Sequence, residues 1–408
     1  MILLELFAII LAILLGVYLA AKLWSRWLKF INAKWLAERD WRLLHIHLPA
    51  NVHRTPEAME YVLHSMVQAG GVGTWFDKYW KGGLLMWFSL EIASIDGKIY
   101  FFIRTEEKFR DLIESQIYAQ YPDAEIREVS DYTRHVTPPG HGGWTIFGTE
   151  YNTGDDTMPI RTYVDLKLDR PLLKFSEKQP ESRIDPMSPL LEGMGSIGHG
   201  EQIWFQILIR TDKFAGWDDR AKEKAEELFK DGRAKDDENN LKFEFAGLSR
   251  DEKIKAIERK SSKTRFECGI RLIYLGHGDS FRPGRIGGVL GAMRTFGSPG
   301  FSSFKFSALT GFEYPWQSEF NRQERQKKII FDNYVNRTFF YNTTLADTSD
   351  LFYSFLTRIL GGKKESKPFV LNTEELATIY HFPGQMVEAP TIMRQPNTAT
   401  RAPDNIPI

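Results

Sequence analysis

The sequence predicts an α+β protein with one N-terminal transmembrane helix, two tandem ferredoxin-like (split βαβ) domains and a helical C-terminal region. Three observations lead to this prediction. Residues 1–21 are almost uninterruptedly apolar. The order strand, helix, strand, strand, helix, strand occurs twice between residues 43 and 312, and helical patterns follow from residue 313. Together they indicate a membrane anchor followed by a globular body.

The composition is that of a folded chain. Hydrophobic residues make up 42% and charged residues 26% of the sequence, which is usual for globular proteins. The formal net charge is zero, which argues against binding nucleic acid by bulk electrostatics. Cys268 is the single cysteine, so no internal disulfide can form, as expected in a reducing compartment. Because Cys268 lies in an apolar strand-like run, we interpret it as a core thiol rather than a nucleophile.

The first predicted element is a transmembrane helix over residues 1–21. Its only charged residue is Glu5, and about 20 apolar residues, each rising ~1.5 Å, cross the hydrocarbon core. A secretory signal peptide is the alternative. No positive residue precedes the apolar run, and the run is longer than a signal-peptide core, so we favour an uncleaved span.

Basic and tryptophan residues directly after the apolar run predict its orientation. They are Lys22, Trp24, Arg26, Trp27 and Lys29. Basic flanks favour the cytoplasmic side, and tryptophan favours the membrane interface. We therefore expect a single-pass protein of the inner (plasma) membrane, with its N-terminus outside and its body in the cytoplasm. Residues 22–42 are expected to form a juxtamembrane amphipathic helix.

Residues 43–135 predict the first ferredoxin-like domain. Strands are expected at 43–48, 84–94, 98–104 and 124–129, with helices at about 56–69 and 106–121. Asp96-Gly97 is a typical two-residue hairpin turn between the middle strands. Thr55 and Thr105 precede the two helices and are typical N-cap residues. The resulting order is that of a split βαβ unit.

Residues 160–312 predict the second ferredoxin-like domain. Strands are expected at 162–168, 201–210, 264–275 and 304–309, with helices beginning near Asp185 and Pro283. A charged helical insertion at 217–260 interrupts the pattern. We interpret the insertion as a solvated helical hairpin rather than a binding arm, because it is rich in Lys, Glu and Asp.

Residues 313–383 predict a helical C-terminal region. Helices are expected at 321–338 and 347–360, and a third follows Asn372. Asn372 and Glu375 have the spacing of a capping box, and Pro383 ends this helix. The proline-rich residues 384–408 are expected to form an extended or disordered tail.

The sequence contains no motif that supplies a catalytic, cofactor-binding or metal-binding residue. No phosphate-binding loop, nucleophile elbow or zinc-protease helix occurs in it. His45 and His47 share one strand face, as two ligands of a metal site would, but no cysteine or carboxylate at ligand spacing accompanies them. A polar sheet face is therefore the favoured interpretation. The loop histidines His135 and His141 are equally weak candidates, and the sequence predicts a protein that is not an enzyme.

The segment Val370-Leu-Asn-Thr-Glu-Glu-Leu-Ala-Thr-Ile-Tyr-His-Phe-Pro-Gly resembles a stretch just ahead of the ATPase domain in conjugation-type (type IV secretion) ATPases and coupling proteins. The blocks 185–210 and 402–407 resemble other regions upstream of that domain. The resemblance implies a membrane and assembly region that lacks the ATPase domain, because the chain ends where that domain is expected. The motor it implies is a separate, AAA-like ATPase.

We therefore expect a non-catalytic, membrane-anchored component of a type IV secretion or conjugation-like machine. Its expected partners are membrane lipid, through residues 1–21, and a separate ATPase or further copies of itself, without direct contact to nucleic acid. The candidate partner-binding residues are Glu375, Leu376, Ile379, Tyr380 and His381. Their short apolar stripe suits a partner's groove, but packing on the protein's own body is an equal alternative. A membrane-bound enzyme with an unrecognised site and a membrane-tethered binder of single-stranded nucleic acid are the other hypotheses.

Overall fold

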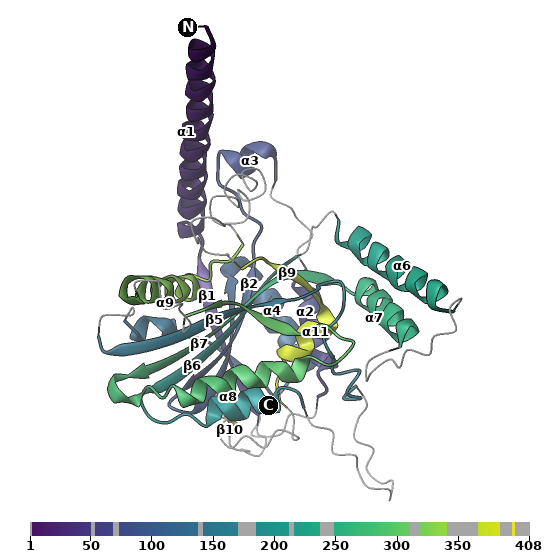
Figure 1. The fold of residues 1–408 in the computed structure, drawn as a ribbon. Coiled ribbons are helices and arrows are strands. Elements are labelled where there is room, and N and C mark those ends of the chain that lie inside the picture. The colour runs from purple at the N-terminus through teal and green to yellow at the C-terminus, as the bar shows by residue number, and fades with distance from the viewer. Residues whose placement is uncertain are drawn as a thin grey trace, which may run out of the picture. The chain divides into compact units, whose positions relative to one another are not determined.

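The computed structural model describes residues 2–49, 54–67, 73–137, 142–169, 185–211, 216–236, 249–310, 319–340, 366–383 and 394–395. The chain divides into two compact units (Figure 1). The first unit contains helices α1 (Ile2–Ala37) and α3 (Trp75–Tyr79). The second contains the sheet and the remaining described helices.

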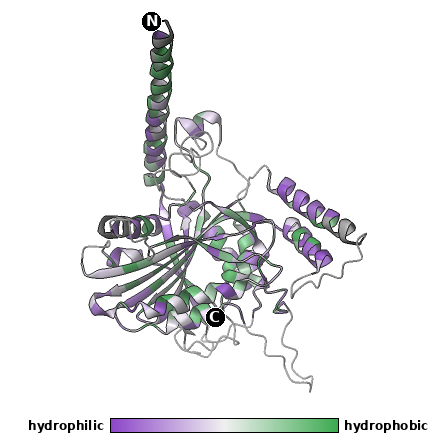
Figure 2. Ribbon diagram, in the orientation of Figure 1, coloured by the Kyte–Doolittle hydropathy of each residue, from purple (hydrophilic) through white to green (hydrophobic). Residues whose placement is uncertain are grey.

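Helix α1 is one continuous helix of 36 residues. The predicted transmembrane and juxtamembrane helices are therefore a single element. It is the one helix among the described residues that is long and apolar enough to cross a membrane. Figure 2 shows that apolar residues are concentrated in its N-terminal part.

The second unit is built on one sheet of ten described strands. The strands are β1 (Trp41–Pro49), β2 (Phe88–Ile95), β3 (Lys98–Glu106), β4 (Glu125–Glu128), β5 (Trp144–Thr153), β6 (Glu201–Thr211), β7 (Arg265–His277), β8 (Phe304–Leu309), β9 (Phe369–Asn372) and β10 (Arg394–Gln395). Their order is β10-β1-β3-β2-β6-β7-β5-β8, with β4 paired to β1 and β9 to β7. All these pairings are antiparallel except that of β1 with β10.

The β2–β3 hairpin has the predicted turn. Asp96 and Gly97 have φ angles of 53° and 82°, as a two-residue hairpin turn requires. A Cβ on Gly97 would lie 2.7 Å from the carbonyl oxygen of Ile197. This position therefore needs glycine both for its backbone conformation and for space.

The helices of the second unit lie on both faces of the sheet. They are α2 (Glu57–Ser65), α4 (Arg110–Gln120), α5 (Ser188–Gly195), α6 (Trp217–Asp236), α7 (Arg250–Ser262), α8 (Gly284–Ala292), α9 (Glu319–Val335) and α11 (Thr373–Ile379), with short 3-10 turns at Glu107–Phe109, Tyr132–His135, Gly278–Ser280 and Met293–Phe296. Helices α2, α4, α5, α8 and α11 contribute to the larger core cluster, on one face. Helix α9 packs on the other face with Trp204 and Ile273. Because both faces are covered, successive strand residues such as Leu43 and Leu44, which point to opposite faces, are both buried.

The structure confirms the coarse fold class: an α+β protein with an N-terminal apolar helix and an antiparallel sheet. The predicted strand at 162–168 is wrong, because these residues form turns. The Thr162 amide donates to Asp165 at 2.9 Å, and Lys167 has a φ of 57°, which an extended strand excludes. The strand is β5 instead, and it precedes the predicted boundary at residue 160.

Two predicted caps are also wrong. Helix α2 begins at Glu57 after Pro56, with no side-chain cap. Thr105 is fully buried inside β3, where it pairs with Arg42 of β1. Helix α4 therefore begins only at Arg110, after a 3-10 turn.

The predicted insertion at 217–260 corresponds to helices α6 and α7. Its base is packed rather than solvated, because Trp217, Ala221 and Ile257 form a small apolar cluster with Met158 and Val370. The predicted helix at 347–360 lies outside the described residues. So does the predicted tail, apart from β10.

Candidate functional site

The candidate site is the segment 366–383 together with the residues that hold it in the second unit. Strand β9 pairs with β7 across Arg265 to Cys268, and α11 follows at once. Asn372 Oδ1 accepts from the Glu375 amide at 2.8 Å, and Glu375 Oε2 accepts from the Asn372 amide at 2.9 Å. The predicted capping box is therefore confirmed.

The five predicted partner-binding residues lie together in the interior. Glu375, Leu376, Ile379 and Tyr380 are 0% exposed, and His381 is 2% exposed. The apolar stripe packs on the protein's own body, which was the equal alternative at the sequence level. In this structure the stripe is not an open surface for a partner.

Glu375 forms an ion pair with Lys260 of α7, with 3.0 Å between Oε2 and Nζ and both side chains fully buried. Lys260 also donates to the Val370 carbonyl at 2.9 Å, and the Ile160 amide donates to Glu375 Oε1 at 2.9 Å. Burial raises the pKa of the Glu375 carboxyl, although Lys260 and the amides of Asn372 and Ile160 act in the opposite direction. A buried pair with this many hydrogen bonds is tolerated because each polar group finds a partner.

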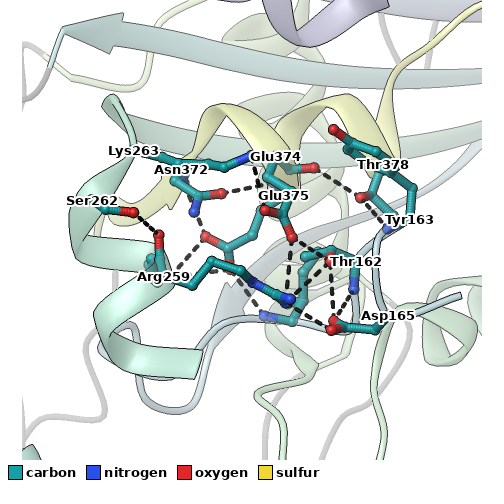
Figure 3. Close-up of polar contacts among 12 residues, drawn as sticks. Thr162, Tyr163, Asp165, Arg259, Ser262, Lys263, Asn372, Glu374, Glu375 and Thr378 are labelled. Atoms are coloured by element: carbon teal, nitrogen blue, oxygen red, sulfur yellow. Dashed lines mark hydrogen bonds and ion pairs between the residues drawn. The ribbon is translucent and has the colours of Figure 1, made fainter. Parts of the chain in front are cut away.

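Glu374 is the centre of a second group of charges, shown in Figure 3. Its carboxylate lies 3.3 Å from Arg259 of α7 and 3.0 Å from Lys263, which directly follows α7. It also accepts from the Thr162 hydroxyl at 2.5 Å. Lys263 reaches further, to Glu60 of α2 at 2.8 Å. These contacts join α11, α7 and α2.

The end of the segment is held by two more polar contacts. The Tyr380 hydroxyl donates to the Phe102 carbonyl of β3 at 3.0 Å. His381 Nε2 lies 2.9 Å from Asp185 Oδ2, and its Nδ1 lies 2.8 Å from the Ala377 carbonyl. Since both ring nitrogens face acceptors, the doubly protonated imidazolium fits this site best.

The pKa values of this pair shift in the directions that the contacts require. Burial lowers the pKa of the His381 imidazole, but the Asp185 carboxylate outweighs burial and the pKa is raised overall. Burial raises the pKa of the Asp185 carboxyl, but His381 and the Met187 amide outweigh it and the pKa is lowered. The segment is therefore held by strand pairing to β7, by a hydrogen bond to β3 and by ion pairs to α7, Lys263 and Asp185.

Another buried charge cluster lies on the face of the sheet opposite to α11. Glu91 of β2 is 0% exposed and lies 2.9 Å from the Arg337 guanidinium, just after α9. Arg337 also pairs with Asp131. Glu91 accepts further hydrogen bonds from Tyr132 at 2.8 Å and from Gln206 at 3.1 Å. The sequence analysis missed this cluster; a lone glutamate inside the apolar run of β2 was the available signal.

The sequence analysis also missed Lys260. Its signal is the spacing of Ala256, Ile257 and Lys260, which are the buried residues of α7. This spacing places the lysine on the apolar face of a helix that otherwise looks solvated. A buried lysine on such a face requires a carboxylate partner elsewhere in the chain.

The other histidines and the cysteine that the sequence singled out are not part of a metal site among the described residues. Within the described ranges, no group of three or more His, Cys, Asp or Glu side chains is arranged to hold a metal ion. The rings of His45 and His47 lie 3.9 Å apart, and burial lowers the pKa of His45 to about 4. The Cys268 thiol is buried, which raises its pKa. His135 ends a 3-10 turn, and His141 lies outside the described residues.

No protein-family model matches this chain, and no curated protein matches it.

Proposed function

We propose that this protein is a non-catalytic, membrane-anchored component of a type IV secretion or conjugation-like machine. In this proposal α1 crosses the inner (plasma) membrane once, with its N-terminus outside and the body in the cytoplasm. The body then holds a separate AAA-like ATPase beside the membrane. The observation that carries the proposal is the firmly held segment 366–383, because the stretch from Val370 to Gly384 resembles the one just ahead of the ATPase domain in such machines.

The contacts of this segment support a positioning role. Strand pairing to β7 and the buried pair between Lys260 and Glu375 fix the segment to the sheet. The Tyr380 and Glu374 contacts fix it to β3 and α7. A segment held at so many points cannot swing independently of the sheet. A motor bound next to Pro383 would therefore keep one orientation relative to the body.

The properties of α1 support the anchor. Its apolar stretch, residues 2–21 with Glu5 as the only charge, spans about 30 Å at ~1.5 Å per residue, which matches the ~30 Å hydrocarbon core of a bilayer. The large apolar side chains between Leu6 and Leu19 are exposed, as those of a lipid-facing helix are. Lys22, Arg26 and Lys29 follow this stretch, which favours a cytoplasmic body by the positive-inside rule.

The strand orders support two tandem ferredoxin-like units as the body's architecture. The first would be β4-β1-β3-β2, with α2 and α4 as its helices. The second would be β8-β5-β7-β6, with α5 and α8. In both units neighbouring strands are antiparallel, and these strands and helices follow one another along the chain in the order strand, helix, strand, strand, helix, strand. Edge strands β2 and β6 would join the two units into one sheet.

The test is a pull-down of the detergent-solubilised full chain from cells that contain the machine. A conjugation-type ATPase should be recovered with the chain, and Lys260→Met, which loosens the segment, should reduce its recovery. Lys255→Met is the matched control, because Lys255 is exposed on the same helix. Circular dichroism establishes whether each variant is folded. Recovery of no ATPase, or equal recovery with folded Lys260→Met, contradicts the proposal.

Self-assembly, an enzyme with an unrecognised site and a binder of single-stranded nucleic acid are the competing functions. Sedimentation of the purified chain tests self-assembly. Binding of single strands that weakens steeply with added salt would favour the nucleic-acid function. Substrate turnover by the purified chain alone would favour an enzyme.

A further inference from the structure

The first unit carries a cluster of exposed aromatic rings at the side of α1. The cluster consists of Trp75, Phe76, Tyr79 and Trp80 of α3 and its end, together with Trp24 and Trp27 of α1; we call it the aromatic platform. The Trp24 ring lies 6.2 Å from Tyr79 and 6.4 Å from Trp80, and the Trp27 ring lies 6.1 Å from Trp80. Figure 1 shows α3 beside α1.

The platform is built on a fixed loop. Thr74 and Asp77 form a capping box at the start of α3, and Lys81 pairs with Asp77 at 2.8 Å. A Cβ on Gly82, whose φ is +70°, would lie 2.4 Å from the Ile31 carbonyl oxygen of α1. The loop therefore sits directly against the α1 backbone.

The rings do not form a buried core. Trp75 is 66% exposed, Phe76 48% and Trp80 50%, and no residue of α3 is buried. Exposing several large aromatic rings at one place is unfavourable in water, so such a patch indicates a partner surface. Lys78 and Lys81 lie among these rings, within 5.1 Å and 5.7 Å of the Tyr79 and Phe76 ring centroids.

The position of the platform along α1 identifies the partner as lipid. Trp24 and Trp27 lie three and six residues after Ala21, where the apolar stretch ends. Tryptophan and tyrosine rings with nearby lysines are the residues that favour the boundary between lipid headgroups and acyl chains. A protein partner would not require the aromatic platform to lie next to the end of the apolar stretch of α1. Continuity with the apolar surface of α1 therefore favours the membrane itself.

We propose that the aromatic platform lies in the headgroup–acyl boundary and gives the protein a second membrane contact besides α1. Trp75, Phe76 and Trp80 would enter the boundary by ~5–10 Å, as interfacial helices do, while Lys78 and Lys81 face phosphate groups. This inference rests on the proposed membrane span of α1. With two contacts, the loop would restrain rotation of α1 about its own axis.

The experiment measures depth by fluorescence quenching in the full chain. Cys268 is fully buried, so single cysteines introduced elsewhere can be labelled selectively. Phe76→Cys and, independently, Trp75→Cys receive a thiol-reactive fluorophore. Gly16→Cys and Ala37→Cys receive the same label as controls on α1; a Cβ at Gly16 meets no atom within 4 Å. Each chain is reconstituted in vesicles of phosphatidylcholine and phosphatidylglycerol that carry a spin label either shallow or deep in the acyl chain.

We expect the shallow label to quench Phe76→Cys and Trp75→Cys about twofold more than the deep label, as interfacial residues require. Gly16→Cys should be quenched more by the deep label, and Ala37→Cys, ~20 Å beyond Trp24 along the helix, by neither. If Gly16→Cys is quenched while both platform labels are unquenched or prefer the deep label, the inference is overturned and the span stands. If Gly16→Cys is unquenched as well, both the span and the inference fail.

Discussion

Helices α9 and α11 pack on opposite faces of the same sheet and are held there by different buried charges. The turn after α9 contains Arg337, whose planar guanidinium forms ion pairs with both Glu91 and Asp131. Helix α11 presents Glu375, which meets the single ammonium of Lys260. In one place a guanidinium joins two carboxylates, and in the other a lysine neutralises one carboxylate.

The difference follows from the partners that each cation has to satisfy. Arg337 donates through three nitrogens at once, and tyrosine and glutamine side chains complete the hydrogen bonds of Glu91. Lys260 has three protons in a compact head, and backbone carbonyls share them with Glu375. Arginine thus organises a network of side chains, whereas lysine holds two backbone carbonyls, those of Met158 and Val370.

The α9 site also carries backbone strain. Arg337 has a φ of 52°, a left-handed conformation that favours glycine or asparagine. An arginine stays there because its guanidinium is held by Glu91 and Asp131. The turn also closes α9, with the Thr338 amide donating to the Asn333 carbonyl at 3.0 Å.

The largest expected effect comes from Arg337→Met. It leaves the buried Glu91 and the partly buried Asp131 without their cation, and the loss should be about 3–5 kcal/mol of unfolding free energy. Urea unfolding measures it. The free energy of unfolding of Arg337→Lys should lie between those of the parent protein and Arg337→Met, because lysine keeps the charge but cannot form the planar fork. Lys328→Met, exposed on α9, is the control, and a loss below about 1 kcal/mol for Arg337→Met would show that the network is dispensable.

Lys260→Met should cost less, about 3 kcal/mol, because one carboxylate rather than two loses its partner. Adding Glu375→Gln should recover part of the loss, since no buried charge then remains unpaired. The double-mutant cycle should give a coupling of about 1–3 kcal/mol. Additive single effects would mean that the pair does not hold α11, and a loss larger than that of Arg337→Met would reverse the comparison.

Asn372→Ala should cost about 1 kcal/mol, because the Glu375 amide loses its side-chain acceptor at the start of α11. Thermal unfolding measures this change. Asn372→Ser keeps an acceptor and should remain within a few tenths of a kcal/mol of the parent protein. If the alanine and serine variants unfold alike, the capping contact contributes nothing measurable.

The smallest expected effect is a pH dependence from His381 and Asp185. The raised pKa of His381 stabilises the folded state fully below about pH 6.5, the unfolded value, and this stabilisation is lost as the pH rises through the higher folded pKa. The lowered pKa of Asp185 stabilises the folded state above about pH 3.9 and is lost as the pH falls through the lower folded pKa. Both contributions are therefore present between about pH 4 and 6.5.

His381→Gln should weaken the protein more at pH 5.5 than at pH 8.5, by a difference under about 1 kcal/mol. Urea midpoints at the two pH values measure this difference. His199→Gln is the control, because the His199 side chain is 96% exposed. An equal loss at both pH values would show that the pKa of His381 is not raised in the folded protein.

The sequence by itself determined the features that depend on neighbouring residues. The apolar length of α1, the Asp96-Gly97 turn and the capping box of Asn372 and Glu375 are all local, and all three are present in the structure. Turn dipeptides, caps and apolar runs act within a few residues, so their chemistry can be predicted without knowing the fold.

Only the tertiary structure decided which surfaces meet. Gly148 interrupts the apolar pattern of strand β5. The close packing of α9 requires glycine there, because a Cβ would lie 2.6 Å from Ile330. Residues 162–168 have a strand-like pattern but turn, because Thr162 is bonded to Asp165 and Glu374. The stripe on α11 is buried because it packs in the core cluster with α2 and β3, where the Tyr380 ring lies 6.1 Å from that of Phe101. These outcomes depend on contacts between residues far apart in the chain, which local propensity does not encode.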